Sequence, residues 1–263
     1  MTDSKQIEQR KWLYPVVYVV LFIISMVPLY AEKPYPPQDT QDVIISLLMV
    51  AGAPYTVYAP IFHIATLLIL AMVFYRPEKM GRLVAGYMGL NYLVIAVTET
   101  MGQTQKYGFV VHTGGLIAYL ILGLTWLVVA VKNDLTPSFK GLTIPEYGLF
   151  LLALLAFWSP YTVVNTTIQP RFDPLLLLTS PDYGMTFCLT TPVFLFGLIL
   201  FYPSVNSFAY RITAFNGLLY GLFNLTHWFS ADRRWMGFLH LPLLIISVYA
   251  LILPRVSKNP KAG

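Results

Sequence analysis

The sequence has little charge, because Asp, Glu, Lys and Arg together make up only 11% of its 263 residues. A soluble globular domain carries about 25% charged residues, so this chain has too few charged side chains to cover a surface that faces water. Hydrophobic residues make up 57% of the chain, and the mean hydropathy is +0.64. The shortage of charge excludes a soluble enzyme and a disordered chain, and it indicates a membrane protein.

Several kinds of chemistry lack the residues that they need. The single cysteine, Cys188, has no partner for an internal disulfide. Every lysine lies outside the apolar segments, which excludes a retinal Schiff base within the membrane. No Walker sequence, Ser-x-x-Lys pair, HxxxH, HExxH or CxxC spacing is present. The basic residues are spread over short loops, which argues against nucleic acid as a partner.

Long apolar stretches dominate what remains. Segments of about 20 apolar residues are long enough to cross the hydrocarbon core as helices, and eight candidates cover residues 13–30, 55–75, 83–103, 109–131, 147–165, 185–203, 208–229 and 236–254. Because an open sheet leaves backbone groups unpaired in lipid, we expect an all-α polytopic bundle of about eight transmembrane helices. Residues 1–263 are expected to form a single integral membrane domain.

Two other stretches are expected to lie outside the regular spans. The apolar run 41–52 is too short to cross the bilayer, so we interpret it as an interfacial or re-entrant helix, or as an extension of a tilted second segment. The outer loop 166–184 contains four leucines between prolines, and we expect it either to lie on the membrane or to cover an outer cavity. The order Thr143-Ile144-Pro145-Glu146 predicts a capping box at the start of the fifth helix.

The distribution of basic residues predicts the orientation of the chain. With the N-terminus inside, inner loops and termini hold twelve Lys and Arg residues, while the outer loops hold only Lys33, Lys106, Arg171, Arg233 and Arg234. Because cytoplasmic loops are enriched in Lys and Arg, both termini are expected in the cytoplasm of a plasma-membrane protein. Cleavage of the first segment as a signal peptide is the alternative, but its apolar stretch is long for one.

Glu99 is the charged residue that falls within an apolar segment instead of a loop. A charge at mid-bilayer costs about 2.5 to 3.5 kcal/mol, so an intramembrane carboxyl is a candidate functional group. Glu99 lies sixteen residues after Leu83, a rise of about 24 Å along a helix, which places it in the outer half of the membrane. We take Glu99 as the candidate catalytic residue and as a candidate metal ligand.

The four histidines are expected in the same outer half, on four different helices. Neutral imidazole is a common ligand of metals and haem, and bundle sites are built from side chains of facing helices. The structural alternative is that each imidazole is simply hydrogen-bonded near a helix end. The candidate cofactor-binding residues are His63, His112, His227, His240, Asn224, Tyr220 and Tyr161, and the four histidines are also the candidate metal ligands.

The seventh segment carries polar residues along one helical face. Thr213, Asn216, Tyr220, Asn224 and His227 recur at steps of three or four residues. Such a stripe is expected to face protein or water, and the neighbouring pair Gly217 and Gly221 is expected to allow close approach of another helix. The inner half of the bundle has little comparable beyond Asn91, Asn216 and Arg211.

The sequence leads to three functional hypotheses. The first is a protein that binds haem, a metal ion or a quinone in an outward-facing polar cavity that contains the histidines and Glu99. The second is a proton-coupled transporter of a small solute, in which Glu99 and a histidine carry the proton. The third is a non-catalytic subunit of a membrane complex, in which the polar groups serve packing alone. The expected partners are therefore the lipid bilayer, a small ligand in the outer half, and candidate complex subunits.

Overall fold

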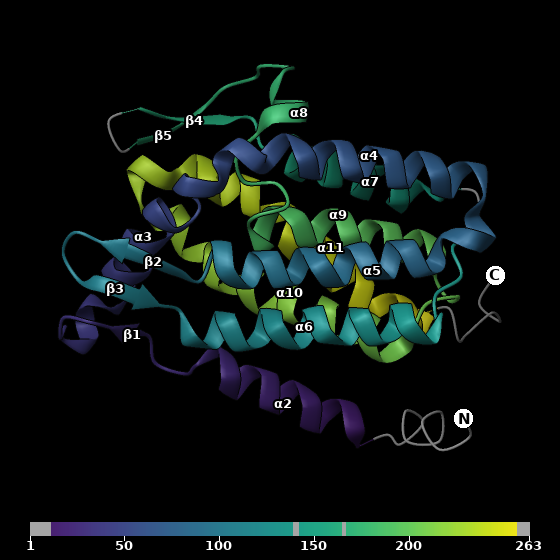
Figure 1. Cartoon of the computed structure of the whole chain (residues 1–263), viewed down its shortest axis with the longest axis horizontal. Helices are drawn as coiled ribbons and strands as arrows, with labels where there is room; N and C mark the ends of the chain where they lie inside the picture. Colours follow the sequence, from purple (N-terminus) through teal and green to yellow (C-terminus); the bar gives the residue numbers. More distant parts are fainter. Residues whose placement is uncertain (1–11, 139–141, 165–166, 257–263) are drawn as a thin grey trace.

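The computed structural model describes residues 12–138, 142–164 and 167–256, and this part of the chain is mostly helical (Figure 1). The α-helices are α2 (Leu13–Ser25), α3 (Thr40–Ala51), α4 (Ala59–Tyr75), α5 (Pro77–Thr98), α6 (Thr113–Lys132), α7 (Ile144–Trp158), α8 (Leu176–Thr179), α9 (Phe187–Phe201), α10 (Ser207–Phe223) and α11 (Arg234–Val256). Short 3-10 helices are η1 (Pro37–Asp39), η2 (Ala53–Tyr58), η3 (Asn224–Phe229) and η4 (Ala231–Arg233). The strands are β1 (Tyr30–Ala31), β2 (Met101–Thr104), β3 (Gly108–Val111), β4 (Tyr161–Val164) and β5 (Thr167–Pro170).

Each of the eight apolar segments contains one long helix of this set: α2, α4, α5, α6, α7, α9, α10 or α11. Within the described residues, four helical stretches are long and apolar enough to cross a membrane, namely Pro37–Tyr75, Pro77–Thr98, Thr113–Lys132 and Ala231–Val256. The apolar helices α2, α7 and α9 are shorter. The expectation of a helical membrane bundle is therefore supported for four helices by length and composition.

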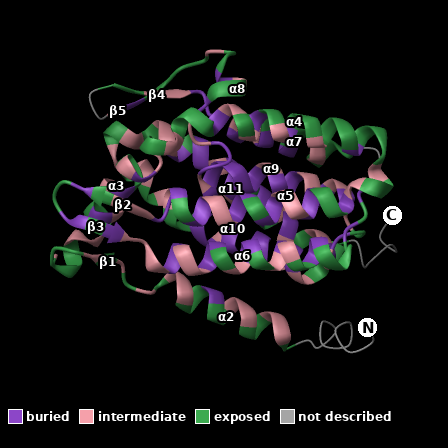
Figure 2. Cartoon of the chain, viewed as in Figure 1, coloured by how far each residue is buried: buried purple, intermediate pink, exposed green. Residues whose placement is uncertain are grey.

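The core lies between α5, α6, α9, α10 and α11, whose facing sides are buried in Figure 2. Large side chains such as Trp126, Tyr119 and Tyr210 are fully buried there. In contrast, α2 and α4 expose many apolar side chains, including Val19 at 57% and Ile61 at 60%. Exposed apolar surface of this extent is unusual for a soluble monomer and is what a helix in contact with lipid requires.

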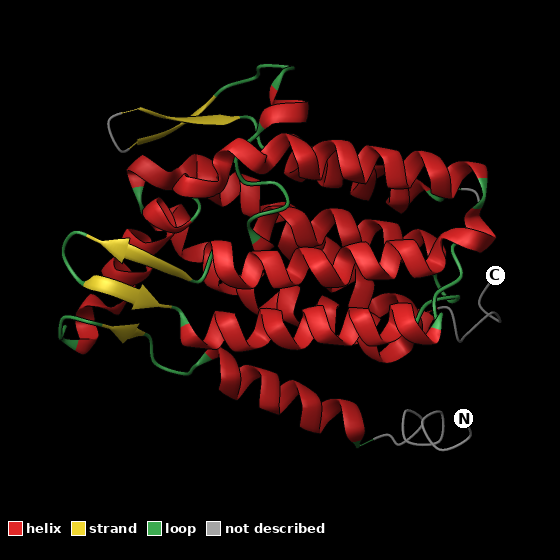
Figure 3. Cartoon of the chain, in the orientation of Figure 1, coloured by secondary structure: helices red, strands yellow, loops and turns green. Residues whose placement is uncertain are grey.

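The structure corrects the predicted ends of the third and fourth segments. Helix α5 ends at Thr98, and β2 and β3 form an antiparallel hairpin in which Gly102 pairs with Val110. The turn depends on Gly108, whose φ of +69° places it in the left-handed region that favours glycine. Strand β1 joins on the other edge of β3. The strands gather at one end of the bundle in Figure 3, which we call the sheet end.

Helix α3 packs against this sheet, and η2 connects it to α4. Its residues Val43, Leu47 and Ala51 form a second small core with Tyr107 and Val110. The apolar run 41–52 is therefore a short helix at the sheet end, as expected of a segment that is too short to span.

The fifth and seventh segments also end earlier than predicted. Helix α7 ends at Trp158 because Ser159 adopts a left-handed conformation with φ of +46°. Tyr161 consequently lies on β4 and not on a helix. Helix α10 ends at Phe223, so Asn224 and His227 belong to the 3-10 helix η3.

Two local predictions are confirmed. Thr143 and Glu146 form the capping box of α7, in which the Thr143 N–H donates to Glu146 Oε2 at 2.7 Å. Gly217 and Gly221 face α11 closely, since a Cβ atom added at Gly221 would lie 2.9 Å from the Cα atom of Leu244. The small residues therefore set the contact between α10 and α11.

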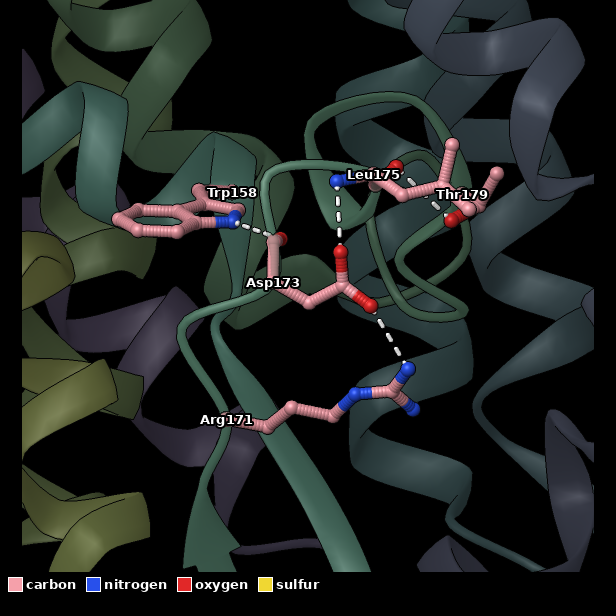
Figure 4. Close-up of polar contacts among 5 residues, drawn as sticks. All are labelled: Trp158, Arg171, Asp173, Leu175 and Thr179. Atoms are coloured by element: carbon pink, nitrogen blue, oxygen red, sulfur yellow. Dashed lines mark hydrogen bonds and ion pairs between the residues drawn. The ribbon is translucent and has the colours of Figure 1, made fainter.

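The loop that contains Arg171, Asp173 and Leu175 is tied to the end of α7, as Figure 4 shows. The Trp158 indole N–H donates to the carbonyl oxygen of Asp173 at 2.8 Å. The Asp173 carboxylate accepts hydrogen bonds from the Leu175 N–H at 2.9 Å and from Arg171 at 2.7 Å. These bonds, with that of the Leu175 N–H the largest contribution, lower the pKa of Asp173. Helix α8 follows directly and packs against α4.

Candidate functional site

Residues 180–188 form a buried segment that enters the bundle between α8 and α9, and we call it the inner segment. It is mostly not helical, and Ser180, Tyr183 and Met185 are each at most 1% exposed. Buried irregular backbone requires protein partners for its N–H and C=O groups. Several of the polar side chains that the sequence analysis singled out form hydrogen bonds with this segment.

The first part of the inner segment is held by α4. The His63 Nε2 atom lies 3.2 Å from both the carbonyl oxygen and the hydroxyl of Ser180. The His63 ring packs between Phe157 and Tyr183, with ring centroids 4.7 and 4.9 Å away. His63 is fully buried, so it acts as a positioning residue for the segment.

Asp182 lies next along the inner segment and accepts a hydrogen bond from the hydroxyl of Tyr161 on β4. Burial raises the pKa of Asp182, although the bond from Tyr161 opposes the shift. Burial and the neighbouring Asp182 charge raise the pKa of Tyr161 well above its ordinary value. Tyr161 and Asp182 therefore form a half-buried pair that the sequence did not predict.

The deepest part of the inner segment is held by α5 and α9. The Asn91 amide donates to the Gly184 carbonyl oxygen at 2.9 Å, and the Gly184 N–H donates to the Thr190 hydroxyl at 2.8 Å. The Thr98 hydroxyl donates to the carbonyl oxygen of Met185 at 2.8 Å. The backbone of the segment is thus paired by side chains of two neighbouring helices.

Glu99 receives the end of the inner segment. Its Oε2 atom accepts a hydrogen bond from the Phe187 N–H at 2.7 Å, and Phe187 is the first residue of α9. The first N–H groups of a helix lack internal partners, and the helix dipole favours negative charge at this end. Glu99 follows α5 directly, so a carboxyl from one helix caps the N-terminus of another.

Aromatic and weakly polar side chains surround Glu99. Cys188, Tyr119 and Tyr220 all lie within electrostatic reach of its carboxylate. The Tyr119 and Tyr220 rings lie 5.4 Å apart, and each also packs against Phe187. These rings exclude water from most of the carboxyl group, and Glu99 as a whole is only 8% exposed.

Two further candidates adjoin this group. His112 precedes α6, and its ring lies 6.3 Å from that of Tyr220. The Asn224 amide donates to Cys188 Sγ at 3.1 Å. Glu99, His112, Tyr220 and Asn224 are therefore the predicted site residues that the structure brings into one neighbourhood, together with Cys188.

The polar stripe of α10 continues from this neighbourhood toward the opposite end of the bundle. Thr213, Asn216 and Tyr220 are buried, as expected of a stripe that faces protein, and Tyr210 extends the same face by a further turn. From Tyr210 to Asn224 the helical rise is about 21 Å. We call these five residues of one face, Tyr210, Thr213, Asn216, Tyr220 and Asn224, the polar column.

Several polar atoms along the column have no hydrogen-bond partner among the described residues. They are the hydroxyls of Tyr210 and Tyr220, the Asn216 Oδ1 atom and, facing Gly217 from α11, the Ser247 hydroxyl. Thr213 is satisfied, since it accepts from the Trp126 indole N–H at 2.9 Å. Buried polar atoms are usually paired with protein or with ordered water, so these atoms of the column are candidates for binding water.

The structure does not support a single cluster of four histidines. His63 lies against the inner segment, His112 beside Tyr220, and His227 against His240 with ring centroids 5.3 Å apart. No group of three or more His, Cys, Asp or Glu side chains suited to a metal ion occurs within residues 12–138, 142–164 and 167–256. The sequence places the four histidines at similar depths along their helices, but in the structure their rings make different contacts.

Sequence reasoning missed Asp182 and Tyr210. Asp182 was assigned to a loop, where a carboxylate is ordinarily solvated, and Tyr210 was one of 18 tyrosines. The spacing of Tyr210 from Thr213 was the available signal for extending the stripe. Neither family models, curated proteins nor solved structures gave a match to this chain.

Proposed function

We propose that this chain is an integral membrane protein that moves protons across the bilayer together with a small solute, with Glu99 as the outer proton-binding group. The observation that carries this proposal is the polar column, which leads from the surroundings of Glu99 along the buried face of α10 to Tyr210. A purely local binding site would not need buried polar groups along most of the length of a helix.

Proton movement along the column follows from the chemistry of its members. Hydroxyl groups both donate and accept hydrogen bonds, and buried water typically pairs polar atoms that lack protein partners. The unpaired atoms of Tyr210, Asn216 and Ser247 lie between Glu99 and the opposite end. We infer that water recruited to these atoms connects Glu99 to the other side of the bundle.

Proton binding at Glu99 is coupled to the inner segment in this proposal. The charged carboxylate is stabilised by the Phe187 N–H and the N-terminus of α9. Protonation removes that attraction, so it weakens the bond that holds the segment against α5. Interrupted helical elements near the middle of a membrane protein are a common site for substrates of transporters, and we place the solute beside this segment.

The orientation is proposed to be cytoplasmic for both termini, in eight spans of the plasma membrane. Helix α2 begins and α11 ends at the same end of the bundle, opposite the sheet end (Figure 1). Arg76, Lys132 and Arg255 adjoin helix ends there, while Lys33 and Lys106 lie beside the sheet. This distribution favours the sheet end as the outer one.

The hypothesis of haem or metal binding started from four histidines at one level, whereas the structure brings only His227 and His240 together among them, with ring centroids 5.3 Å apart. The hypothesis of a non-catalytic subunit makes a different prediction, since packing residues alone would give no proton movement. Proton flux therefore separates the transporter from the subunit.

The test is proton flux into sealed vesicles that contain the purified protein, driven by a potassium diffusion potential and followed with an enclosed pH-sensitive dye. We expect flux with the wild type and a loss of at least about tenfold in Glu99→Gln, because Gln retains the acceptor oxygen but binds no proton. Glu146→Gln is the matched control, since Gln also serves in a capping box, and it is expected to keep full flux. Absence of wild-type proton flux, or full flux in Glu99→Gln, would overturn the proposal.

A further inference from the structure

Two tyrosines of α2 lie against α10 near the end of the bundle that is opposite the sheet end (Figure 1). Arg211 lies over the ring of Tyr14, with its guanidinium carbon 4.4 Å from the ring centroid. One turn further along both helices, the Tyr18 and Phe215 rings stack with centroids 4.2 Å apart. Residues four positions apart share one helical face, so α2 and α10 run side by side here and hold Arg211 at their contact.

Arg255, in the last turn of α11, brings a second positive charge to the same contact. Both Arg211 and Arg255 lie within electrostatic reach of Tyr18. Arg255 is exposed and Arg211 is half-buried, so the two guanidinium groups are open to the outside of the bundle. We call Tyr14, Tyr18, Arg211 and Arg255 the arginine site.

The arginine site has no counter-charge among residues 12–138, 142–164 and 167–256. The ion pairs found in these ranges involve other basic residues, so neither arginine of the site has a carboxylate partner there. Glu146 is held in the capping box of α7, and Asp134 accepts a hydrogen bond from Asn206 at 2.6 Å. Partial burial of an unpaired charge costs free energy, so the site favours an anion.

The chemistry of the arginine site is suited to a phosphate group. Guanidinium groups donate two parallel hydrogen bonds to phosphate oxygens, and the Tyr18 hydroxyl is a further donor. Tyrosine is enriched where a membrane meets water. Basic pockets between helices at the cytoplasmic side of membrane proteins bind anionic lipid head groups.

Helix α2 also provides an apolar surface beside the site. Leu21 is the one residue of α2 that is buried, and Figure 2 shows this helix at the edge of the bundle. Val16, Val19 and Val20 are exposed. A ligand with acyl chains would cover such a surface, whereas a soluble phosphate would leave it bare.

We propose that the arginine site binds the head group of an anionic phospholipid. The lipid phosphate lies between the guanidinium groups of Arg211 and Arg255, and its acyl chains follow the exposed side of α2. The lipid thereby links α2 to α10 and α11. The inference rests on the membrane location proposed above, but it is independent of proton movement through Glu99.

The experiment measures binding of lipids to the full-length wild-type protein in detergent micelles by native mass spectrometry. The probes are phosphatidylglycerol, which is anionic, and phosphatidylcholine with the same acyl chains, whose quaternary ammonium makes it neutral. We expect phosphatidylglycerol to bind at least about tenfold more tightly, because hydrogen bonds to charged groups are the stronger kind and the ammonium is repelled by the second arginine. Equal binding of the two lipids overturns the proposal.

Glycerol 3-phosphate, added as a competitor, separates the two sources of a phosphate group. We expect it to leave phosphatidylglycerol bound when the two are at equal concentration, since it has no acyl chains to pack on α2. Displacement under these conditions identifies a soluble phosphate as the ligand and overturns the assignment to a lipid. Because micelles sustain no proton gradient, this result does not depend on whether the protein moves protons.

Variants locate the lipid. Arg211→Gln and Arg255→Gln each remove one guanidinium group and are expected to lower the affinity for phosphatidylglycerol at least about fivefold. Arg76→Gln is the matched control, since it removes the same charge at the same end but from the turn between α4 and α5, across the bundle from α2 (Figure 1).

The Arg76→Gln control is expected to keep the wild-type affinity. Arg255 is exposed at a helix end, so its replacement tests the site even where Arg211→Gln does not fold. An equal loss of affinity in Arg76→Gln and Arg255→Gln would show that the lipid follows the overall positive charge of this end, and it would contradict a specific site. Unchanged affinity in a folded Arg255→Gln protein would contradict it as well.

Discussion

The carboxyl of Glu99 caps the N-terminus of α9 by accepting a hydrogen bond from the Phe187 N–H at 2.7 Å. This bond joins two residues that are 88 positions apart in the chain, and it holds the end of the buried inner segment. The same carboxyl adjoins Tyr220, a member of the polar column. The proposed proton-binding group is thus the side chain that holds the end of the inner segment.

Asn216 tests whether the polar column conducts. Asn216→Leu replaces a buried amide, one atom of which lacks a partner, with an apolar side chain of similar size. We expect proton flux to fall at least about tenfold, while thermal stability is retained because an unpaired buried atom costs about 1 to 3 kcal/mol. The measurement is vesicle flux together with the unfolding temperature. Unchanged flux in a stable Asn216→Leu protein would place the path elsewhere.

Asp182 predicts how stability depends on pH. Burial raises its pKa in the folded protein, so the folded chain holds this proton at pH values where the unfolded chain, with a pKa of about 3.9, has lost it. The stability that the proton supplies is complete below the unfolded pKa and is lost as pH rises through the folded pKa. Wild type is therefore expected to lose stability relative to Asp182→Asn as pH increases.

The comparison for Asp182 uses unfolding temperatures of both proteins over a pH series. The difference between them should grow with pH and then become constant once the wild-type carboxyl is charged in both states. A difference that stays constant throughout the series would show that Asp182 titrates alike in the folded and unfolded chain.

The contact between α10 and α11 predicts opposite effects for two glycines. Gly221→Ala places a Cβ atom 2.9 Å from the Cα atom of Leu244, and overpacking of this kind costs about 1 to 3 kcal/mol. Gly148→Ala in α7 meets nothing within 4 Å and should gain about 0.5 to 1 kcal/mol of helix propensity. Unfolding temperatures check both, and stabilisation by Gly221→Ala would contradict the close packing.

The proposed orientation predicts which loops face the outside. In a Cys188→Ser background, Lys106→Cys at the sheet end should react with a membrane-impermeant maleimide on intact cells. Lys132→Cys, at the end of α6, should react only after the membrane is opened. Labelling in the reverse pattern would invert the topology.

Much of the helical framework could be predicted from the sequence because apolar length and helix signals are local. All eight apolar segments contain a helix, and the capping box of Thr143 and Glu146 forms as written. The stripe on α10 was visible because its spacing belongs to one helix. The hairpin at 101–111 was hidden because its apolar residues continue those of α5 and α6, although Gly102 and Gly108 interrupt them.

The arrangement of the site could not be predicted because it depends on how helices pack. The spacing along each helix predicts similar depths for His63, His112, His227 and His240, but it does not predict how the helices are arranged around one another. The sequence therefore predicts one shared cavity, whereas the structure has separate contacts. It also suggested that polar groups gather near one surface. The structure changes that interpretation, since Asn91 reaches the inner segment at Gly184 and the column extends to Tyr210.

The infrared absorption of the protonated carboxyl group of Glu99 is the most direct test of the central claim. The protein in lipid discs is titrated across the physiological pH range in an Asp182→Asn background, and the spectra are compared with those of the same protein carrying Glu99→Gln. The account predicts a carboxylic C=O band that titrates reversibly and disappears in Glu99→Gln. A band that is unchanged by that substitution, or a Glu99 band that does not respond to pH, would contradict the role of Glu99 as the proton-binding group.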